Sequence, residues 1–202
     1  MGKEFARVCG SNYQTRVLTP FFYNSLVISR RERETLIVVG IDPGLANLGI
    51  GVVREQGVTP HYVYAELVKT SSESSSPQRL AMIYKSVKSV LELHQPDALA
   101  IEAQFFQLQP GTAFKVGEAV GVVLLACAQL EIPVFEYSPK EVKAAVVGTG
   151  TASKDQIMFM VRAVLQLPKT PSSNHAADAL ALALTHLANR RIRTQMGISR
   201  KV

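Results

Sequence analysis

The chain has 202 residues, of which 47% are hydrophobic and 19% are charged, and its formal net charge at pH 7 is +6. This size and apolar content suit one α/β domain with a well-buried core, and the positive charge favours an anionic partner, with nucleic acid first and an anionic membrane surface second. The two cysteines, Cys9 and Cys127, lie far apart, which excludes a zinc spacing or a disulfide framework. The longest apolar run, 119–128, is too short to span a bilayer, and no signal peptide is recognisable. We therefore expect a cytoplasmic protein without membrane association.

The N-terminal segment 1–34 looks like an addition to the fold. It shows no sustained hydrophobic period and ends in a run of alternating arginine and glutamate at 30–34. We expect it to be disordered or an artefact of an upstream start codon, rather than a DNA-contacting arm. The folded domain is predicted over 35–190, and a basic tail over 191–202.

The domain begins with three β-type segments, at about 36–42, 48–54 and 60–68, whose short connections predict an antiparallel meander. A polar loop leads into an amphipathic helix over 79–94. The later elements are expected to be a strand at 98–102, a helix at 111–130, a strand at 134–136, and helices that begin at Ser138, at Ser153 and near Asn174, of which the last two should end near 165 and 189. Three meandering strands followed by strand–helix alternation predict an α/β fold, with a mixed five-stranded sheet flanked by helices.

Asp42 ends the first apolar strand and is followed at once by a Pro-Gly turn. Burying an unpaired carboxylate is costly, and a bound cation would remove that cost. Asp-Pro-Gly is also ordinary turn chemistry, so Asp42 alone is compatible with either a metal ligand or a turn-capping residue.

Three further groups are candidate metal ligands, and the first of them repeats the pattern of Asp42. Glu102 ends the apolar run 98–102, where a solvent-exposed carboxylate at a strand end is the alternative. His175 and Asp178 lie in the first turn of a helix that is apolar all round, and their i, i+3 spacing puts both on one face. The alternative for this pair is an Asp that interacts with the helix dipole beside a partly buried His.

The argument strengthens when the carboxylates and the imidazole are taken together. If they converge on one point, they repel one another unless a cation is bound. Mg²⁺ and Mn²⁺ take oxygen ligands, and Mn²⁺ also accepts imidazole. Two such ions activate water and stabilise the leaving oxygen in phosphodiester cleavage. A basic protein with an acidic metal site therefore fits a nuclease.

Several short motifs with a characteristic order and spacing extend from about residue 37 to 190. They are Gly40-Ile-Asp-Pro-Gly44, Gly49-Ile-Gly-Val52, Ala100-Ile-Glu102, Val134-Phe-Glu-Tyr137, Val142-Lys143, Val146-Val-Gly-Thr-Gly150 and His175-Ala-Ala-Asp178-Ala-Leu-Ala. Together they resemble the RuvC crossover-junction endodeoxyribonucleases.

This resemblance implies an RNase H-like fold and a homodimer that resolves four-way (Holliday) DNA junctions in recombination and repair. It implies two symmetric nicks, which leave 5′-phosphate and 3′-hydroxyl ends, and two Mg²⁺ or Mn²⁺ ions in each active site. It also implies the RuvA–RuvB branch-migration complex as a partner.

The resemblance also assigns roles to individual residues. Asp42 would be shared by both ions, while Glu102 and Asp178 would each complete one of them. His175 stands where some members carry Asp, and it would be a ligand or would orient the attacking water.

The same resemblance suggests DNA contacts. Lys143 and Lys154 match phosphate-contacting positions, although two solvated helix lysines are the simpler interpretation of the residues alone. Phe105 matches an aromatic residue that could stack on an unpaired base, and loop packing is its alternative.

The chain departs from the family at two places. Leu48 and Ile50 stand where a Thr and a Tyr are common, and the loop 107–111 is less basic than usual. We expect these differences to affect DNA contacts and sequence preference rather than the chemistry.

Three other functions compete with this interpretation. A phosphotransferase of the actin and sugar-kinase type also begins with strand, Asp, Gly turn and strand, but it needs a second phosphate loop, for which 148–151 is too sparse. A non-catalytic junction-binding protein would not need the metal-competent groups. An RNase H-like nuclease acting on RNA would share the core, but it is disfavoured by the match in the last helix.

Overall fold

A computed structural model describes residues 35–103, 110–169, 171 and 173–196 of the chain. Its five strands are β1 (Thr35–Asp42), β2 (Asn47–Gln56), β3 (Thr59–Lys69), β4 (Ala98–Glu102) and β5 (Val134–Tyr137). The first three pair antiparallel, β4 and β5 run parallel to β1, and the order across the sheet is β3-β2-β1-β4-β5. The predicted mixed five-stranded sheet is confirmed.

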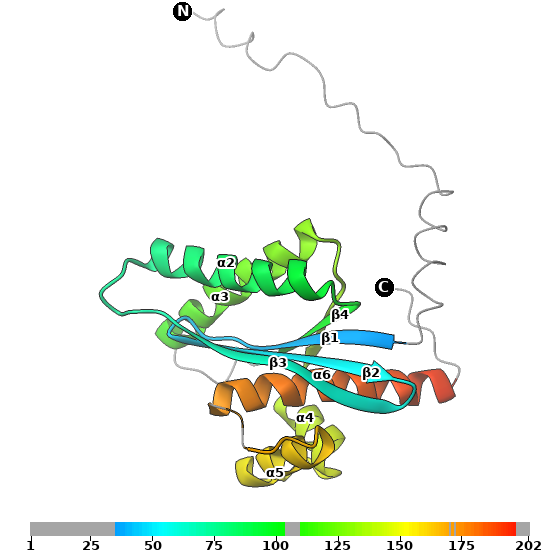
Figure 1. Ribbon diagram of the computed structural model, residues 1–202. Coiled ribbons are helices and arrows are strands. Elements are labelled where there is room, and N and C mark those ends of the chain that lie inside the picture. Colours follow the sequence, from blue (N-terminus) through cyan, green and yellow to red (C-terminus); the bar gives the residue numbers. More distant parts are fainter. Residues whose placement is uncertain (1–34, 104–109, 170, 172, 197–202) are drawn as a thin grey trace, which may run out of the picture. The chain divides into compact units, whose positions relative to one another are not determined.

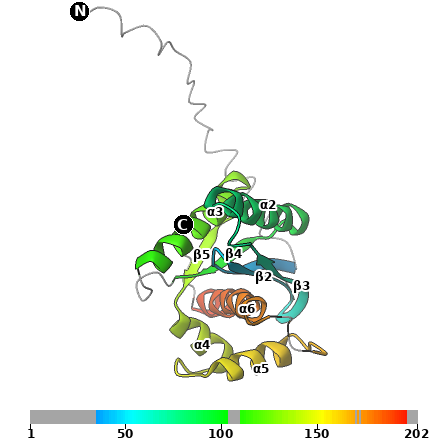
Figure 2. The same cartoon turned by 90° about the vertical axis from the view of Figure 1, so that its left-hand side faces the viewer.

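Helices cover both faces of this sheet (Figures 1 and 2). The helices are α2 (Ser76–His94), α3 (Pro110–Gln129), α4 (Pro139–Val147), α5 (Lys154–Val164) and α6 (Asn174–Gln195). Figure 2 shows α2 and α3 on one side of the sheet, α6 on the other, and α4 and α5 outside α6. Two cores result, because alternate strand residues such as Val38 and Val39 point to opposite sides.

The three helices on the α6 side begin at serine caps. Ser138 and Ser153 accept hydrogen bonds from the backbone amides of Glu141 and Gln156, and each forms a reciprocal capping box. The sequence predicted that both helices begin at these serines. The cap of α6 is Ser173, whose hydroxyl accepts from the amide of Ala176 at 3.1 Å. These caps fix the first residue of each helix and therefore the side chains of the first turns.

Glycines on β1 and β2 allow α6 to lie unusually close to the sheet. A Cβ atom added to Gly51 would lie 2.6 Å from the backbone nitrogen of Leu180, and one added to Gly40 would collide with the carbonyl of Ala179. Any side chain at either position would push α6 away. The glycines therefore hold the start of α6 against the ends of β1 and β2.

The far end of α6 extends further than the sequence indicated. We predicted an end near 189, but the helix continues to Gln195. Glu55 of β2 is only 4% exposed, and its carboxylate accepts a 2.7 Å hydrogen bond from Nε of Arg191. The Arg190 guanidinium lies 3.8 Å from the same carboxylate. This long-range ion pair fixes the last turns of α6, and local sequence does not reveal it.

The apolar segment within α3 is also longer than the run 119–128 suggested. Among the described residues, α3 is the one helix whose length and composition would allow it to cross a membrane, and 28% of its apolar window is buried. One face of α3 packs against α2 and contains the buried Cys127. Its other face is exposed at Phe114 and Leu125.

Several predictions fall outside the described residues. They concern the extension 1–34, the base-stacking candidate Phe105, the first part of the loop 107–111, and the end of the tail, 197–202.

Candidate active site

Two of the predicted carboxylates lie side by side because β1 and β4 are parallel neighbours. Ile41 pairs with Ile101 in the β1–β4 register, and Asp42 and Glu102 are the next residues of their strands. Adjacent parallel strands place residues in register on the same face and at the same edge of the sheet. The sequence places each carboxylate at a strand end, and the parallel pairing brings the two ends together.

The first turns of α6 add the other two predicted groups. Nδ1 of His175 and Oδ2 of Asp42 are joined by a hydrogen bond of 2.6 Å, although 133 residues separate them in the chain. The Asp42 side chain is 14% exposed and that of His175 is 42% exposed, so solvent reaches the site from the histidine side. Asp178 lies one turn further along the same helix.

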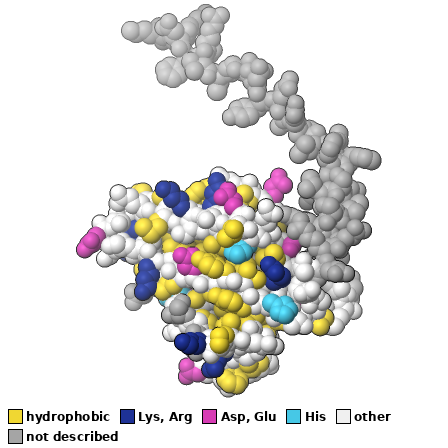
Figure 3. All heavy atoms as spheres, in the orientation of Figure 1, with side chains coloured by type: hydrophobic (Ala, Val, Ile, Leu, Met, Phe, Trp, Pro, Cys, Tyr) yellow, Lys and Arg dark blue, Asp and Glu magenta, His cyan; other side chains and the backbone are white. Residues whose placement is uncertain are grey.

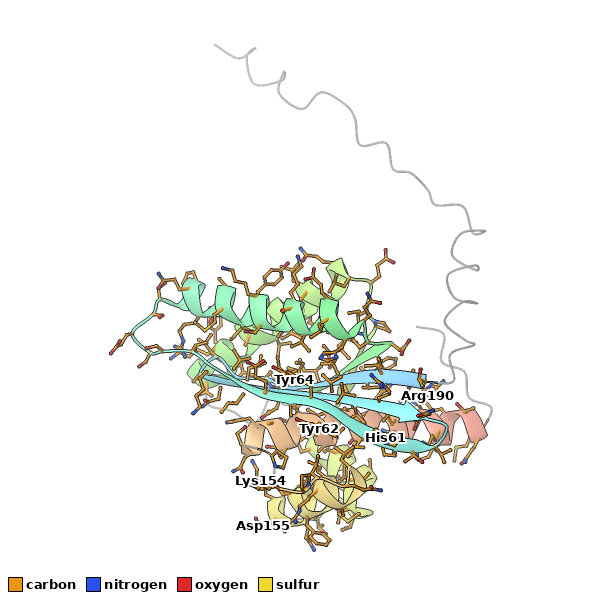
Figure 4. The ribbon with its side chains drawn as sticks, viewed as in Figure 1. His61, Tyr62, Tyr64, Lys154, Asp155 and Arg190 are labelled. Atoms are coloured by element: carbon orange, nitrogen blue, oxygen red, sulfur yellow. The ribbon has the colours of Figure 1, made fainter. Side chains whose placement is uncertain are left out.

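A lysine from α5 completes the cluster. Nζ of Lys154 lies 2.9 Å from Oδ2 of Asp178. Figure 4 shows Lys154 between α5 and the N-terminal end of α6, with Asp155 farther from α6. Lys154 is therefore paired with a member of the acidic cluster, although its side chain is 54% exposed. The contact itself was not predicted, because it depends on how α5 packs against α6.

Burial and neighbouring carboxylates raise the pKa values of two members of the cluster, Asp42 and Glu102. Burial raises the pKa of Asp42, the hydrogen bond from His175 lowers it, and the nearby Asp178 carboxylate raises it. Burial and the charges of Asp42 and Asp178 raise the pKa of Glu102 to about 7, against the opposing effect of Lys154. The hydrogen bond to Asp178 raises the pKa of Lys154. The negative charge of this cluster is thus incompletely neutralised, an arrangement typical of functional sites.

A cavity of about 250 Å³ opens beside the cluster. It is lined by Glu102, Pro139, Val142, Lys143, Lys154, Ile157, Asp178 and Leu182. The cavity therefore has carboxylates from β4 and α6, lysines from α4 and α5, and apolar side chains in its lining. Of the seven residues predicted for the site, six lie at this cluster or line this cavity, and Phe105 lies outside the described residues.

The comparisons with known proteins point to one family. The family model described as "Crossover junction endodeoxyribonuclease RuvC" matches residues 38–186. The chain belongs to the RuvC family.

Individual RuvC proteins agree with this assignment. The chain is 43% identical to RuvC of Thermus thermophilus over 154 residues, which cover 75% of this chain and 93% of that protein. It is 39% identical to RuvC of Natranaerobius thermophilus over 161 residues, which cover 80% of this chain and all of that protein. The structure of T. thermophilus RuvC in complex with Holliday junction substrate superposes with a TM-score of 0.76 and 41% identity, covering 83% of this chain and 99% of that one.

A more distant structure supports the fold alone. The yeast mitochondrial Holliday junction resolvase Ydc2 has 12% identity and a TM-score of 0.55, with 79% of this chain and 85% of that chain covered. The mixed sheet and its flanking helices are thus shared beyond the RuvC proteins.

The donor set of this RuvC chain is suited to a hard divalent cation. Carboxylate oxygens with one imidazole are ligands that Mg²⁺ and Mn²⁺ accept, and the mutual repulsion of the carboxylates favours a bound cation. Over the described residues, no three His, Cys, Asp or Glu side chains are gathered closely enough to hold a metal ion as they stand. Asp178 instead contacts Lys154, and Asp42 contacts His175. The chemistry of the site fits a metal, although these side chains point to their own internal partners.

Proposed function

We propose that this chain is a metal-dependent endonuclease that resolves four-way DNA junctions by two symmetric nicks during recombination and repair. The observation that carries the proposal is a cluster of three neighbouring carboxylates at one end of the sheet, one of them in contact with an imidazole, beside a cavity that two lysines line. The acidic groups suit metal ions, and the lysines suit DNA phosphates. The family assignment supports the same activity.

Each member of the acidic cluster has a distinct proposed role. Asp42 is the residue best placed to be shared, because it contacts His175 and lies near enough to Asp178 for that carboxylate to add to the effect of burial in raising the pKa of Asp42. Glu102 and Asp178 would each hold one side of the site, and His175 would act as a ligand or orient the attacking water. Two bound Mg²⁺ or Mn²⁺ ions would lower the pKa of that water and stabilise the leaving oxygen.

The net reaction is the hydrolysis of one phosphodiester in each nicked strand. The water oxygen forms a bond to phosphorus, the bond from phosphorus to O3′ breaks, and a proton reaches O3′. The products are a 5′-phosphate and a 3′-hydroxyl. The chain's own contribution is to position the water with His175 or a carboxylate and to hold the phosphate next to the cluster.

The basic side of the cavity would hold the DNA backbone. Lys143 and Lys154 line it, and Pro139 and Lys154 are the first residues of α4 and α5. Helix N-termini carry partial positive charge and favour phosphate. Backbone contacts of this kind position DNA without reading sequence. We assign the stacking on an unpaired base to Phe105.

Two symmetric nicks require two sites, which we propose a homodimer supplies. The exposed face of α3 offers a surface for it, because Phe114 is 70% exposed and Leu125 is 53% exposed. A Cβ atom added to Gly117 or Gly121 on the same helix would meet no atom of the described residues within 4 Å beyond the helix backbone itself, which would let a second backbone approach. A two-fold interface presents the same patch from both copies.

We also propose a cytoplasmic location and the RuvA–RuvB branch-migration complex as a partner.

The test is cleavage of a mobile four-way DNA junction by the full chain in Mg²⁺, in Mn²⁺ and in EDTA. We expect paired nicks at symmetric positions with either metal and none in EDTA, and no cleavage of a linear duplex with the same sequence. Mapping the ends should find ligatable 5′-phosphates. Binding without cleavage in both metals would identify a non-catalytic junction-binding protein, and preferential cleavage of an RNA junction would identify an RNA nuclease.

A further inference from the structure

The contact between Lys154 and Asp178 joins a lysine at the surface to the acidic cluster. The Lys154 side chain is 54% exposed and could extend into water, but its Nζ lies 2.9 Å from Oδ2 of Asp178. Its backbone position is fixed, because Lys154 directly follows the Ser153 cap and α5 packs against α6. The ammonium therefore lies where the packing of two helices places it beside the acidic cluster.

This ammonium neutralises more than its direct partner. Its charge lowers the pKa of both Asp42 and Glu102, in addition to its contact with Asp178. Lys143 lines the same cavity, but among the described residues it forms no ion pair with these carboxylates. Lys154 is thus the lysine that occupies the region of negative potential where a divalent cation would also be attracted.

We propose that in the DNA-free protein the Lys154 ammonium neutralises the acidic cluster in place of a metal ion. A DNA phosphate would then draw the ammonium away from Asp178. This inference rests on the proposed function. A lysine is a point charge on a flexible four-carbon stem, so it can exchange a carboxylate partner for a phosphate without moving the backbone. The cavity that Lys154 lines gives a phosphate access to it.

The exchange would make metal and DNA bind cooperatively. Metal binding to the free protein must displace Lys154 from Asp178, so the apparent metal affinity is reduced by the fraction of molecules in which the pair is formed. Once a phosphate holds Lys154, that competition ends and the metal binds more tightly. The coupling is reciprocal, so metal also strengthens junction binding. In a cell, the DNA-free protein would then have a lower metal occupancy than the junction-bound protein.

The first experiment measures Mn²⁺ binding to the DNA-free full chain by electron paramagnetic resonance, which detects unbound Mn²⁺. Lys154→Met keeps the stem and removes the charge. It should bind Mn²⁺ about three- to fivefold more tightly than wild type, the upper part of the range expected for loss of a competing, partly exposed ion pair. The matched variant Lys143→Met should stay within about twofold of wild type.

A double-mutant cycle tests whether the effect acts through Asp178. In an Asp178→Asn background, Lys154→Met should change Mn²⁺ affinity much less than it does in wild type. Circular dichroism verifies that each variant is folded, and if a methionine variant is not, glutamine at the same position replaces it. Unchanged or weaker Mn²⁺ binding in folded Lys154→Met overturns the proposal, as does an equal gain in both backgrounds.

A second experiment tests release by DNA. Lysine side chains labelled with ¹³C and ¹⁵N are observed by nuclear magnetic resonance, and the Lys154 signal is assigned by its absence in Lys154→Met. Adding a four-way junction in EDTA should shift that signal, and a Lys154 signal that stays in place at saturating junction overturns the exchange. Wild-type junction cleavage is measured separately. If cleavage occurs but the metal affinities do not differ, this inference fails alone, whereas an absence of cleavage in any metal refutes the proposed function.

Discussion

The two ends of α6 both hold carboxylates against the sheet, but they balance the charge differently. At the C-terminal end, Glu55 is 4% exposed and meets the guanidinium groups of Arg190 and Arg191. At the N-terminal end, Asp42, Glu102 and Asp178 share one lysine and one imidazole. Figure 4 labels Lys154 and Arg190 toward the opposite ends of this helix.

The difference separates a structural ion pair from a candidate functional site. A buried carboxylate that is matched by arginine adds little net stability, but breaking the pair is costly because a charge is left unpaired. A cluster with surplus negative charge is already unfavourable without a cation, so stability alone does not explain why it is there. The charge balance around a buried carboxylate is thus the observation that distinguishes the two ends.

The largest expected effect comes from the acidic end. Asp42→Asn should reduce junction cleavage by about a thousandfold or more, comparable to losing a major electrostatic stabiliser, while junction binding is retained or slightly tightened. Glu102→Gln and Asp178→Asn should behave alike. Single-turnover cleavage and gel-shift binding measure the two effects. Asp155→Asn, at the exposed start of α5, is the matched control and should cleave like wild type. Loss of binding by folded Asp42→Asn would contradict the assignment.

Matched Glu→Gln changes at the two ends test the charge balance directly. Glu55→Gln should lower the free energy of unfolding by about 3 kcal/mol, because Arg191 loses its buried partner. Glu102→Gln in EDTA should leave stability unchanged or raise it, because a repelling charge is removed. Urea unfolding in EDTA measures both. Mg²⁺ should then stabilise wild type but stabilise Glu102→Gln much less. Equal destabilisation at both ends would show that the acidic end is also a structural pair.

Much of this arrangement follows from the sequence. The ends of β1 and β4 at Asp42 and Glu102, and the caps Ser138 and Ser153, follow from short-range patterns that the structure confirms. Asp42 and Glu102 lie together only because β1 pairs parallel with β4. The alternation of strands and helices in the sequence favours such a pairing but does not specify it. The residue roles came from the family resemblance and stay predictions.

The missed features all depend on long-range packing. The ion pair of Arg191 with Glu55, which extends α6 beyond 189, joins residues 136 apart. The contact of Lys154 with Asp178 requires α5 and α6 to be neighbours. The close approach of α6 to Gly51 could have been predicted, since repeated glycines in a β-strand indicate a second backbone nearby.

Surface hydrophobic residues limit what the sequence predicts about the core. Figure 3 shows hydrophobic side chains on the surface, among basic, acidic and histidine side chains, so apolarity alone does not define the core.

A titratable group between the two ends gives a pH test. His186 of α6 is 5% exposed, and its Nδ1 lies 2.9 Å from the hydroxyl of Tyr137. Burial and the charges of Arg193 and Arg190 lower the pKa of His186 to about 4. Because the unfolded chain has a His pKa of about 6.5, it binds more protons than the folded state between these values, and stability falls as the pH falls through this window.

The expected size of this effect is about 2–3 kcal/mol between pH 7 and pH 4, with the contribution fully present above pH 6.5. His186→Gln keeps a hydrogen-bonding group and removes the titration. The variant should therefore lose less stability than wild type over the same pH range, as measured by urea unfolding. Parallel stability curves for the two proteins would show that His186 does not titrate in this way.

The imidazole at the acidic end should tune the choice of metal. Imidazole suits Mn²⁺ better than Mg²⁺, whereas carboxylate suits both. We expect His175→Asp to remain active and to lower the ratio of the Mn²⁺ rate to the Mg²⁺ rate by about three- to tenfold, corresponding to roughly 1 kcal/mol. Single-turnover cleavage in each metal gives the ratio. If wild type and variant have identical ratios, His175 is not a ligand and only positions Asp42 or the water.

The smallest expected effect concerns Lys143, which separates DNA contact from metal competition at the acidic end. Lys143 lines the cavity but, among the described residues, forms no ion pair with the cluster, so we expect it to contact phosphate alone. Lys143→Ala should lower the slope of log affinity against log salt by about 0.9, the change for one lost phosphate contact. In EDTA, Lys154→Ala should lower the same slope by a similar amount. The two variants should then differ only in their affinity for metal. Neither change should move the cleavage site, because phosphate contacts carry no sequence information. A salt titration of junction binding with cleavage mapping decides this, and a shifted cleavage sequence in Lys143→Ala would make it a base-reading residue instead.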